Sequence, residues 1–242
     1  MTQQAPIKRL SELASEQWGL LTRRQAEESG VSPATLQRLS NSEVLERAAW
    51  GVYHLVGAPE PEQMALRAAW LGLAPETPAW ERGQEQGVVS HRSAAALYGL
   101  GHLPADRHVF TMPNRRQVRR KDVRVHRGKL TDAEWIVLRG LPVTCPSRIA
   151  ADLLADHEDP EAVAHIIADA IRGAFDQPGT FAQELEPQAS RLGFRRSDGI
   201  ATLRWLLDLV GDPESPRWMK EARASFADSE ASPSPEEAAL PR

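Results

Sequence analysis

Three neighbouring polar residues, Gln37, Arg38 and Asn41, have side chains that can recognise the bases of double-stranded DNA. In the major groove, glutamine and asparagine form paired hydrogen bonds with adenine, and arginine forms them with guanine. Such side chains also occur on helices that merely face solvent, so their chemistry alone leaves both interpretations open. The choice between them depends on the elements that carry these residues.

The segment that carries them, residues 32–41, is predicted to be a helix. Ser32 can cap its first amides, and Pro33 suits the first helical position because no hydrogen-bond donor is needed there. Leu36 and Leu39 lie three residues apart and share one face, which must pack inward. At about 100° per residue, the three polar side chains then point outward.

A shorter helix is predicted just before this one, and the pair makes a helix-turn-helix. Thr22 can accept a hydrogen bond from the amide of Gln25, whose side chain can reach back, so the two residues form a capping box. Gly30 then ends the helix, because glycine readily adopts the left-handed conformation of a helix C-terminus. The apolar spacing of residues 7–14 predicts a further helix ahead of the pair.

Two strand-like runs follow within residues 44–56, on either side of Trp50-Gly51, and predict a β-hairpin. Helices followed by a hairpin in this order make a winged helix-turn-helix. Arg47 on the hairpin suits a contact with the DNA backbone. Arg23 and Arg24, near the start of the shorter helix, could touch phosphate, although a solvated face explains them equally well.

A basic run, residues 114–121, lies between strand-like segments at 108–112 and 123–126 and is predicted to form a hairpin tip. Its five cations have no acidic residue among them. The run could therefore neutralise DNA phosphates or bind an acidic protein, and a solvated tip without a ligand is the alternative. The predicted DNA-binding residues are Arg23, Arg24, Ser32, Gln37, Arg38, Asn41, Arg47, Arg115, Arg116, Arg119, Arg120 and Lys121.

Few residues offer catalytic chemistry. Ser90, His91 and Asp152 are the types found in hydrolases, but no G-x-S-x-G motif is present, and structural roles are expected. Cys145 precedes a predicted helix start, where a helix dipole can lower the pKa of a thiol, yet no histidine is adjacent in the sequence. A buried structural role is favoured for it. We therefore expect a protein that is not an enzyme, with no catalytic residue, no metal ion and no cofactor.

The composition indicates a soluble globular protein. The chain has 242 residues, of which 41% are hydrophobic, and its net charge of -4 argues against a uniformly basic surface that coats nucleic acid. Its single cysteine cannot form an intramolecular disulfide, which fits a reducing cytoplasm. No signal sequence or long apolar run is visible, so we expect a cytoplasmic location and no membrane partner.

The expected fold class is α+β and mostly helical, with three parts along the chain. Residues 1–57 form the winged helix-turn-helix, and 58–211 form a larger α/β-mixed domain with a small sheet, the basic hairpin and C-terminal helices. Residues 212–242 are acidic and rich in proline and serine, and are expected to be a largely disordered tail. The prolines within 57–61 mark the first boundary.

An ordered series of short motifs resembles the AbiEi-type antitoxins of bacterial abortive-infection, or type IV, toxin-antitoxin systems. The motifs are Gly19-Leu-Leu-Thr-Arg-Arg-Gln-Ala26, Gly30-Val-Ser32, Gly51-Val-Tyr53, Ser90-His-Arg-Ser-Ala94, Tyr98-Gly-Leu100, Val123-Arg-Val-His126 and Gly140-Leu-Pro-Val-Thr144, followed by Pro146, Arg148 and Asp152. Each motif alone is weak, but their order is specific. The similarity extends over most of residues 7–175.

The resemblance implies a winged-helix repressor domain followed by a domain that counteracts a cognate nucleotidyltransferase toxin. Its DNA partner would be inverted repeats in the promoter of its own operon, bound by a homodimer or by two monomers side by side. The same N-terminal region also resembles that of proteins that carry an endonuclease domain with a D…E-x-K motif. Residues 176–242 lack a strand pair with such residues, which argues against nuclease activity. A winged-helix regulator whose second domain binds a ligand or protein, without a toxin, is the alternative.

Overall fold

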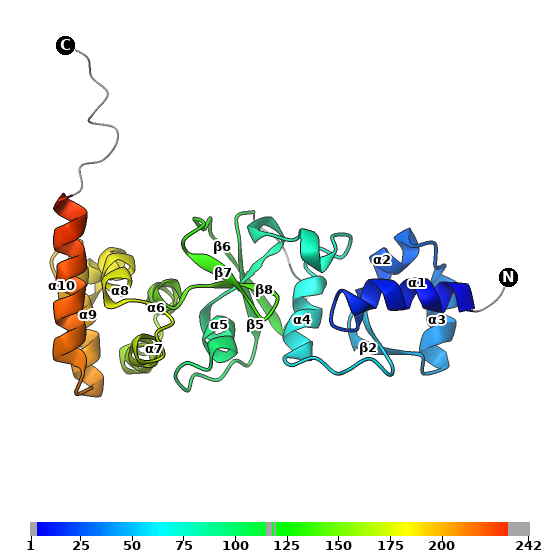
Figure 1. The fold of residues 1–242 in the computed structure, drawn as a ribbon, viewed down its shortest axis with the longest axis horizontal. Helices are drawn as coiled ribbons and strands as arrows, with labels where there is room; N and C mark the ends of the chain where they lie inside the picture. The colour runs from blue at the N-terminus through cyan, green and yellow to red at the C-terminus, as the bar shows by residue number, and fades with distance from the viewer. Residues whose placement is uncertain (1–3, 115–117, 119, 232–242) are drawn as a thin grey trace, which may run out of the picture. The chain divides into compact units, whose positions relative to one another are not determined.

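The computed structural model describes residues 4–114, 118 and 120–231, and these fall into two compact units. The first unit comprises residues 1–89, 106–130 and 137–143, and the second comprises residues 90–105, 131–136 and 144–242. Figure 1 gives the element labels. Each unit is described by itself.

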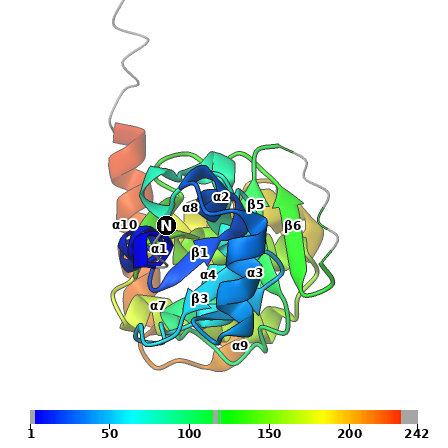
Figure 2. The ribbon, with the colours of Figure 1, turned by 90° about the vertical axis from the view of Figure 1, so that its right-hand side faces the viewer.

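The first unit begins with three helices and a small antiparallel sheet (Figure 2). The elements are α1 (Gln4–Ser15), β1 (Leu20–Thr22), α2 (Arg23–Glu28), α3 (Pro33–Asn41), β2 (Leu45–Ala49) and β3 (Val52–Leu55). The strand order is β1-β3-β2, so the hairpin of β2 and β3 is completed by the short strand before α2. This is the winged helix-turn-helix that the sequence predicts, with β1 as an additional strand.

A single apolar cluster holds these elements together. It joins Leu10 and Ala14 of α1 to Leu36 and Leu39 of α3 and to Leu45 of β2. Each of these side chains is almost completely buried. Burial of one leucine contributes about 1.5–3 kcal/mol, so the orientation of α3 is set by its two leucines.

The first unit continues with α4 (Met64–Leu71), the 3-10 helices η1 (Ala79–Glu81) and η2 (Gln84–Gln86), and a second sheet. Its strands are β4 (Val88–Val89), β5 (His108–Met112), β6 (Val123–Arg127), β7 (Trp135–Leu138) and β8 (Leu141–Thr144), in the order β6-β5-β4-β8-β7. Helix α4 also contacts all three strands of the winged helix-turn-helix. The predicted boundary at residue 57 stays a prediction, because the unit that contains it extends beyond it.

The predicted hairpin around the basic run is wrong. Strands β5 and β6 pair in parallel, with His108 opposite Val123 and Met112 opposite Arg127. Parallel strands cannot be joined by a tight turn, and the chain re-enters the sheet at Val123, beside His108 where β5 begins. The run lies in the connection between these two parallel strands, here called the basic crossover, and most of its residues lie outside the described part of the chain.

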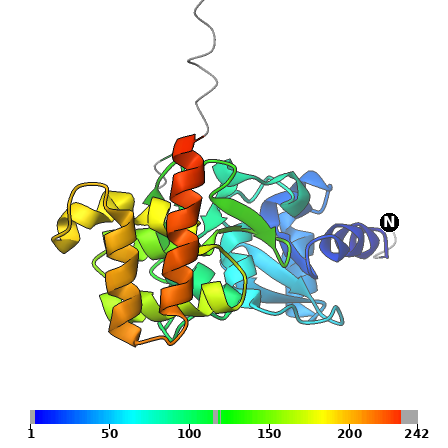
Figure 3. The same ribbon diagram turned by 60° about the vertical axis from the view of Figure 1, so that its left-hand side comes forward.

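The second unit consists mainly of helices (Figure 3). They are α5 (His91–Tyr98), α6 (Pro146–Ala155), α7 (Pro160–Arg172), α8 (Pro178–Leu185), η3 (Glu186–Leu192), α9 (Gly199–Val210) and α10 (Ser215–Ala231). Helices α6, α7 and α8 begin with proline at the first helical position. Asp198 caps α9 by accepting a hydrogen bond from the amide of Ala201 at 2.9 Å. A side chain at Gly199 would collide with the Ala182 carbonyl oxygen, so only glycine permits this approach of α8 and α9.

The expected disordered tail contains a helix. Helix α10 starts three residues after the predicted boundary at 212 and packs against α8 and α9. Trp218, Met219 and Ala222 lie on its buried face. Their spacing supplies enough apolar surface to fix this helix despite the polar composition around it. Residues 232–242 lie outside the described residues.

The predicted fold class, α+β and mostly helical with a winged helix-turn-helix in front, is confirmed. Within the described residues, no helix is both long enough and apolar enough to cross a membrane.

Candidate nucleic-acid interface

The outward face of α3 carries the three predicted base-reading residues. Gln37, Arg38 and Asn41 are all exposed, while Leu36 and Leu39 on the opposite face are buried. Gln37 Nε2 donates a hydrogen bond to Asn41 Oδ1 at 2.8 Å. The two amides therefore hold each other in place on the surface, one helical turn apart.

Short-range caps fix both ends of the helix-turn-helix. Ser32 Oγ accepts a hydrogen bond from the amide of Thr35 at 3.2 Å, which starts α3 at the predicted residue. Thr22 and Gln25 form the predicted capping box, with hydrogen bonds of 3.1 and 2.9 Å. Gly30 has φ +80°, as the end of α2 requires. The hydroxyl of Ser32 is thus engaged within the protein, although the residue is exposed.

Buried glutamines join the helix-turn-helix to the following segment of the same unit. The side chains of Gln17 and Gln25 exchange two hydrogen bonds, each 3.0 Å long. Gln17 Oε1 also accepts from the amide of Ala79 at 2.9 Å, and Gln25 Nε2 donates to the Thr77 carbonyl at 3.2 Å. Local sequence patterns do not predict this network, because it connects residues more than 50 positions apart.

The two arginines of α2 are already paired with acidic residues. Arg23 Nε lies 2.7 Å from Glu27 Oε1, and this hydrogen bond raises the pKa of Arg23. Arg24 lies 3.9 Å from both Glu27 and Glu76. Within the described residues, Arg38 makes no ion pair, so its positive charge is the one on the helix-turn-helix surface that a phosphate or base would meet without competition.

The tip of the wing carries an exposed tryptophan. Trp50 is 79% exposed and lies at the turn between β2 and β3, where Gly51 has φ +72°. The Arg47 guanidinium lies over its ring, 4.5 Å from the centroid, and Arg47 Nε donates to the Ala49 carbonyl at 3.4 Å. In the sequence, Trp50 marks the turn of the predicted hairpin and is not among the predicted DNA-binding residues. Its position at the tip of a two-residue turn is the signal that could have identified it.

The basic crossover is described only in part. Arg115, Arg116 and Arg119 lie outside the described residues. Arg120 forms a bidentate ion pair with Asp122, and the hydrogen bond from Arg120 is the main cause of the lowered pKa of Asp122. Lys121 is exposed. The part of the run that is described therefore offers one engaged and one accessible cation.

The candidate hydrolase residues do not form one site. Ser90 Oγ lies 2.9 Å from His91 Nδ1, and His91 Nε2 lies 3.9 Å from a carboxylate oxygen of Asp156. Asp152 instead pairs with Arg148 at 2.8 Å. Ser90 is completely buried, so a substrate cannot reach its hydroxyl. This geometry supports the structural role expected for Ser90 and His91.

Cys145 occupies the N-cap position of α6, but its surroundings oppose ionisation. Burial raises the pKa of its thiol to about 11, and the nearby carboxylates of Asp176, Glu184 and Glu134 add to the effect. The thiol donates to the Ala133 carbonyl at 3.4 Å. The helix dipole is thus outweighed, and the favoured structural role agrees with this environment.

We expect Cys145 to react slowly with iodoacetamide in the folded protein. At pH 8 its thiolate fraction should be about 100-fold below that of an ordinary cysteine, because burial raises the pKa of the thiol to about 11. The labelling rate should increase as the pH approaches 11. Mass spectrometry of folded and urea-unfolded protein measures both rates, and equal rates at pH 8 would contradict the expectation.

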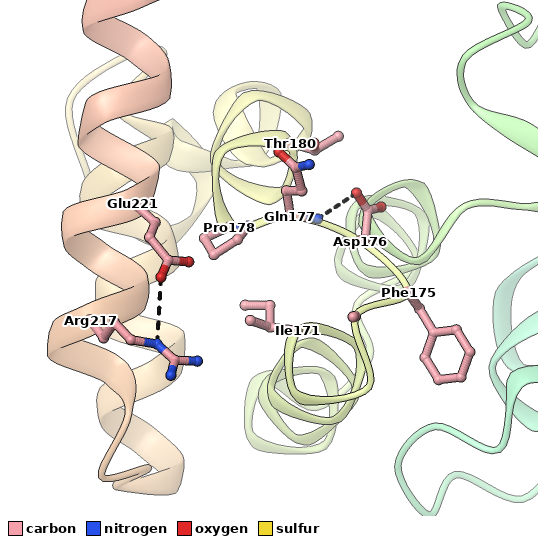
Figure 4. Close-up of a pocket in the computed structure, with 9 residues that line it drawn as sticks. Ile171, Phe175, Asp176, Gln177, Pro178, Thr180, Arg217 and Glu221 are labelled. Carbon is pink, nitrogen blue, oxygen red and sulfur yellow. Dashed lines mark hydrogen bonds and ion pairs between the residues drawn. The ribbon is translucent and has the colours of Figure 1, made fainter.

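The second unit has a pocket of about 610 Å³ between the end of α7, the start of α8 and α10 (Figure 4). Its charged groups already have partners in the protein. Asp176 accepts hydrogen bonds from the amides of Ser147 and Gln177 at 3.0 and 2.8 Å. Arg217 pairs with Glu221 at 3.5 Å and with Glu214 at 2.6 Å. The lining therefore does not indicate a specific ligand chemistry.

A family model matches part of the chain. The family model described as "Transcriptional regulator, AbiEi antitoxin" matches residues 8–56, from the first turns of α1 to the end of the wing. No curated protein matches the chain. The predicted resemblance is therefore confirmed over the winged helix-turn-helix.

Proposed function

We propose that this chain, whose residues 8–56 match the family model of AbiEi antitoxin transcriptional regulators, represses its own operon by binding promoter DNA. In this proposal α3 enters the major groove, and Gln37, Arg38 and Asn41 contact base edges. Arg47 and Trp50 contact the DNA beside it. Arg23, Arg24, the Ser32 end of α3 and the basic crossover lie against phosphates.

The observation that carries the proposal is the exposed polar face of α3. Helix α3 is anchored by the buried side chains of Leu36 and Leu39, and Ser32 caps its first turn. Its outward side chains are therefore held in one defined orientation. Recognition of bases requires such a rigid register, because a paired hydrogen bond tolerates little displacement. The accessible charge of Arg38 and the family match both favour a role of this face in DNA binding. They argue against a face that is merely solvated.

Footprinting of the full-length protein on the DNA upstream of its own gene tests the proposal. We expect protection of two inverted half-sites separated by whole helical turns, about 34 Å apart or a multiple of it, as two copies of one module require. Protection that does not exceed that on unrelated DNA of the same length would overturn the proposal.

We further propose that the chain counteracts a nucleotidyltransferase toxin, acts without catalysis of its own and functions in the cytoplasm. The description of the matched family as an antitoxin supports the first point. Co-expression with the product of a neighbouring nucleotidyltransferase gene should restore growth that the toxin alone arrests. A metal-dependent nuclease assay on plasmid DNA should give no cleavage.

Replacement of Trp50 with alanine should weaken operator binding about tenfold. An apolar ring at a wing tip can wedge into the minor groove, and its contact is not screened by salt. The slope of log affinity against log salt should therefore stay unchanged for Trp50→Ala, whereas Arg47→Ala should reduce it by about 1. Fluorescence anisotropy at several salt concentrations measures both.

Trp80→Ala is the matched control, because Trp80 is also exposed but belongs to η1 and not to the wing hairpin. It should bind the operator as the wild type does. If Trp50→Ala and Trp80→Ala both keep full affinity, the wing tip is not part of the interface.

A further inference from the structure

A pocket of about 460 Å³ opens in the first unit beside α1. It is lined by the second half of α1, by the Trp18-Gly19 turn, and by Leu55 and the connection that follows β3. The volume lies within the range of about 300–1,000 Å³ that is typical of small-molecule sites. None of the residues discussed above as DNA contacts lines it.

The walls of the pocket are mostly apolar and one wall is a fixed aromatic ring. Ala14, Leu55, Ala58, Pro59 and Pro61 supply aliphatic surface. Two other side chains contact the Trp18 ring. The Arg67 guanidinium lies 4.2 Å from its centroid, and the Trp70 ring lies 6.1 Å away. A rigid aromatic wall with aliphatic neighbours suits a flat ring system.

A buried nitrogen next to the pocket lining has no hydrogen-bond partner among the described residues. His54 is 6% exposed, and its Nε2 is without a partner among the described residues. A Cβ atom added to Gly19 would lie 2.9 Å from this nitrogen and 2.8 Å from the Ala58 Cβ. Gly19 and Ala58 both line the pocket, so His54 Nε2 lies close to the pocket lining, although His54 itself is not one of the lining residues. Buried polar atoms are usually paired, and although Asp152 Oδ2 and Trp218 Nε1 are in the same condition, His54 Nε2 is the atom of this kind next to Gly19 and Ala58 of the pocket lining.

We propose that this pocket binds a small, uncharged aromatic heterocycle with a ring nitrogen. The ring would lie against Trp18 and the prolines, and its nitrogen would pair with His54 Nε2 after a small shift of Ala58. Glu60 on the pocket lining adds negative charge, which favours a ligand with an N–H group and disfavours an anion. The proposal does not depend on DNA binding.

An occupant of this pocket would contact the same core that supports α3. Ala14 and Leu55 line the pocket, and both pack in the apolar cluster that contains Leu36 and Leu39. The first unit thus has a ligand site that shares core residues with its helix-turn-helix.

Nuclear magnetic resonance titration of the full-length, ¹⁵N-labelled protein tests the proposal. The probes are indole and benzimidazole, with benzoate as the anionic comparison. We expect saturable shifts of the Trp18 side-chain N–H and the Ala58 amide, with a Kd of about 1 mM or tighter for so small a ligand. Benzoate should bind at least about tenfold more weakly, because Glu60 repels it.

Ser15→Phe is the blocking variant, because Ser15 lines the pocket and is exposed on α1. It should abolish the saturable shifts. Lys8→Phe adds the same ring to α1 outside the pocket and should leave them unchanged. Thermal melts check that both variants fold, and Ser11→Phe, another lining residue, replaces Ser15→Phe if it does not fold.

Three outcomes would overturn the proposal. The first is the absence of saturable shifts with either heterocycle. The second is binding that persists in Ser15→Phe. The third is a dimer in sedimentation experiments that Ser15→Phe dissociates, because the occupant of the pocket would then be a second copy of the chain.

Discussion

The triple variant Gln37→Ala, Arg38→Ala, Asn41→Ala is expected to bind the operator about 100-fold to 10,000-fold more weakly than the wild type. Each paired hydrogen bond between a side chain and a base is worth about 1–3 kcal/mol of discrimination, and the proposed interface contains up to three. Arg38 should account for the largest part, since it is also the cation on this face without an ion pair among the described residues.

The fold should not change in this variant. All three side chains are exposed, and α3 is held by Leu36 and Leu39 on its other face. Alanine is also the best helix former. Circular dichroism and thermal melting check this point, and electrophoretic mobility shift on the footprinted region measures the affinity.

A matched control removes the same kinds of group elsewhere. Gln183, Lys220 and Arg223 are exposed on α8 and α10 and supply one amide and two cations. Their replacement by alanine should leave the affinity within about twofold, because these side chains belong to the second unit and not to the proposed interface, and an exposed charge is screened at physiological salt. Equal losses in both triple variants would mean that α3 does not read the bases.

The losses of binding free energy in the single variants should not add up to the loss in the triple variant. Gln37 and Asn41 share a 2.8 Å hydrogen bond, so alanine at one position frees the amide of the other. Residues within one hydrogen-bonded group show coupling of about 0.5–3 kcal/mol. We expect the loss for the pair to differ from the sum of the two single losses by more than experimental error.

The helix-turn-helix could be predicted residue by residue because its signals are local. The capping box of Thr22 and Gln25, the left-handed Gly30 and the Ser32-Pro33 start all act within four positions of the chain. Such short-range interactions are determined by neighbouring residues alone. The leucine spacing then fixed which side of α3 is exposed.

Features that depend on distant parts of the chain could not be predicted in this way. The parallel pairing of β5 and β6 depends on whether Val123 lies beside the first or the last residue of β5. No local sequence signal determines this. The exchange of hydrogen bonds between Gln17 and Gln25 requires the segment at Thr77 and Ala79 to pass beside it.

The candidate site was predicted in part for the same reason. Side-chain chemistry and helical spacing indicated Gln37, Arg38 and Asn41, whose exposure the structure describes. The ion pairs that engage Arg23 and Arg24 involve Glu27 and Glu76, of which only the first is a near neighbour in the sequence. Whether a basic residue is accessible to DNA therefore depends on tertiary structure, which composition does not reveal.

A buried ionic cluster in the second unit centres on Arg148. Its Nε lies 2.8 Å from Asp152 Oδ1, and its Nη1 pairs with Glu134 Oε1. The arginine side chain is 22% exposed, and the two acidic side chains are less exposed. Glu134 also accepts a hydrogen bond from the amide of Thr131 at 2.6 Å. One cation thus compensates two largely buried carboxylates.

Arg148→Met should lower the free energy of unfolding by about 3 kcal/mol at pH 7. Methionine keeps the apolar stem, so the variant removes mainly the positive charge and leaves both carboxylates uncompensated. Urea unfolding measures the loss. Arg217→Met is the control, because Arg217 is 64% exposed and its ion pairs should contribute less than about 1 kcal/mol.

The loss of unfolding free energy in Arg148→Met should become smaller as the pH falls. The direction of this change follows from the pKa shifts of the two carboxyl groups. Burial alone would raise the pKa of Glu134, but hydrogen bonds from Thr131 and Arg148 outweigh it and lower the pKa. Glu134 therefore stabilises the wild type above its unfolded pKa, and this stability is lost as the pH falls through the lower folded value. Burial raises the pKa of Asp152 although Arg148 opposes it, so Asp152 contributes in the opposite direction.

Without Arg148, both carboxyl groups should have raised pKa values and bind protons more readily in the folded state. The variant then gains stability relative to the wild type as the pH approaches about 4, near the ordinary pKa of a carboxyl group. Adding Glu134→Gln to Arg148→Met should recover part of the loss at pH 7 for the same reason. A loss that is constant between pH 4 and pH 7 would mean that Arg148 stabilises the unit by packing, without compensating the two carboxylates.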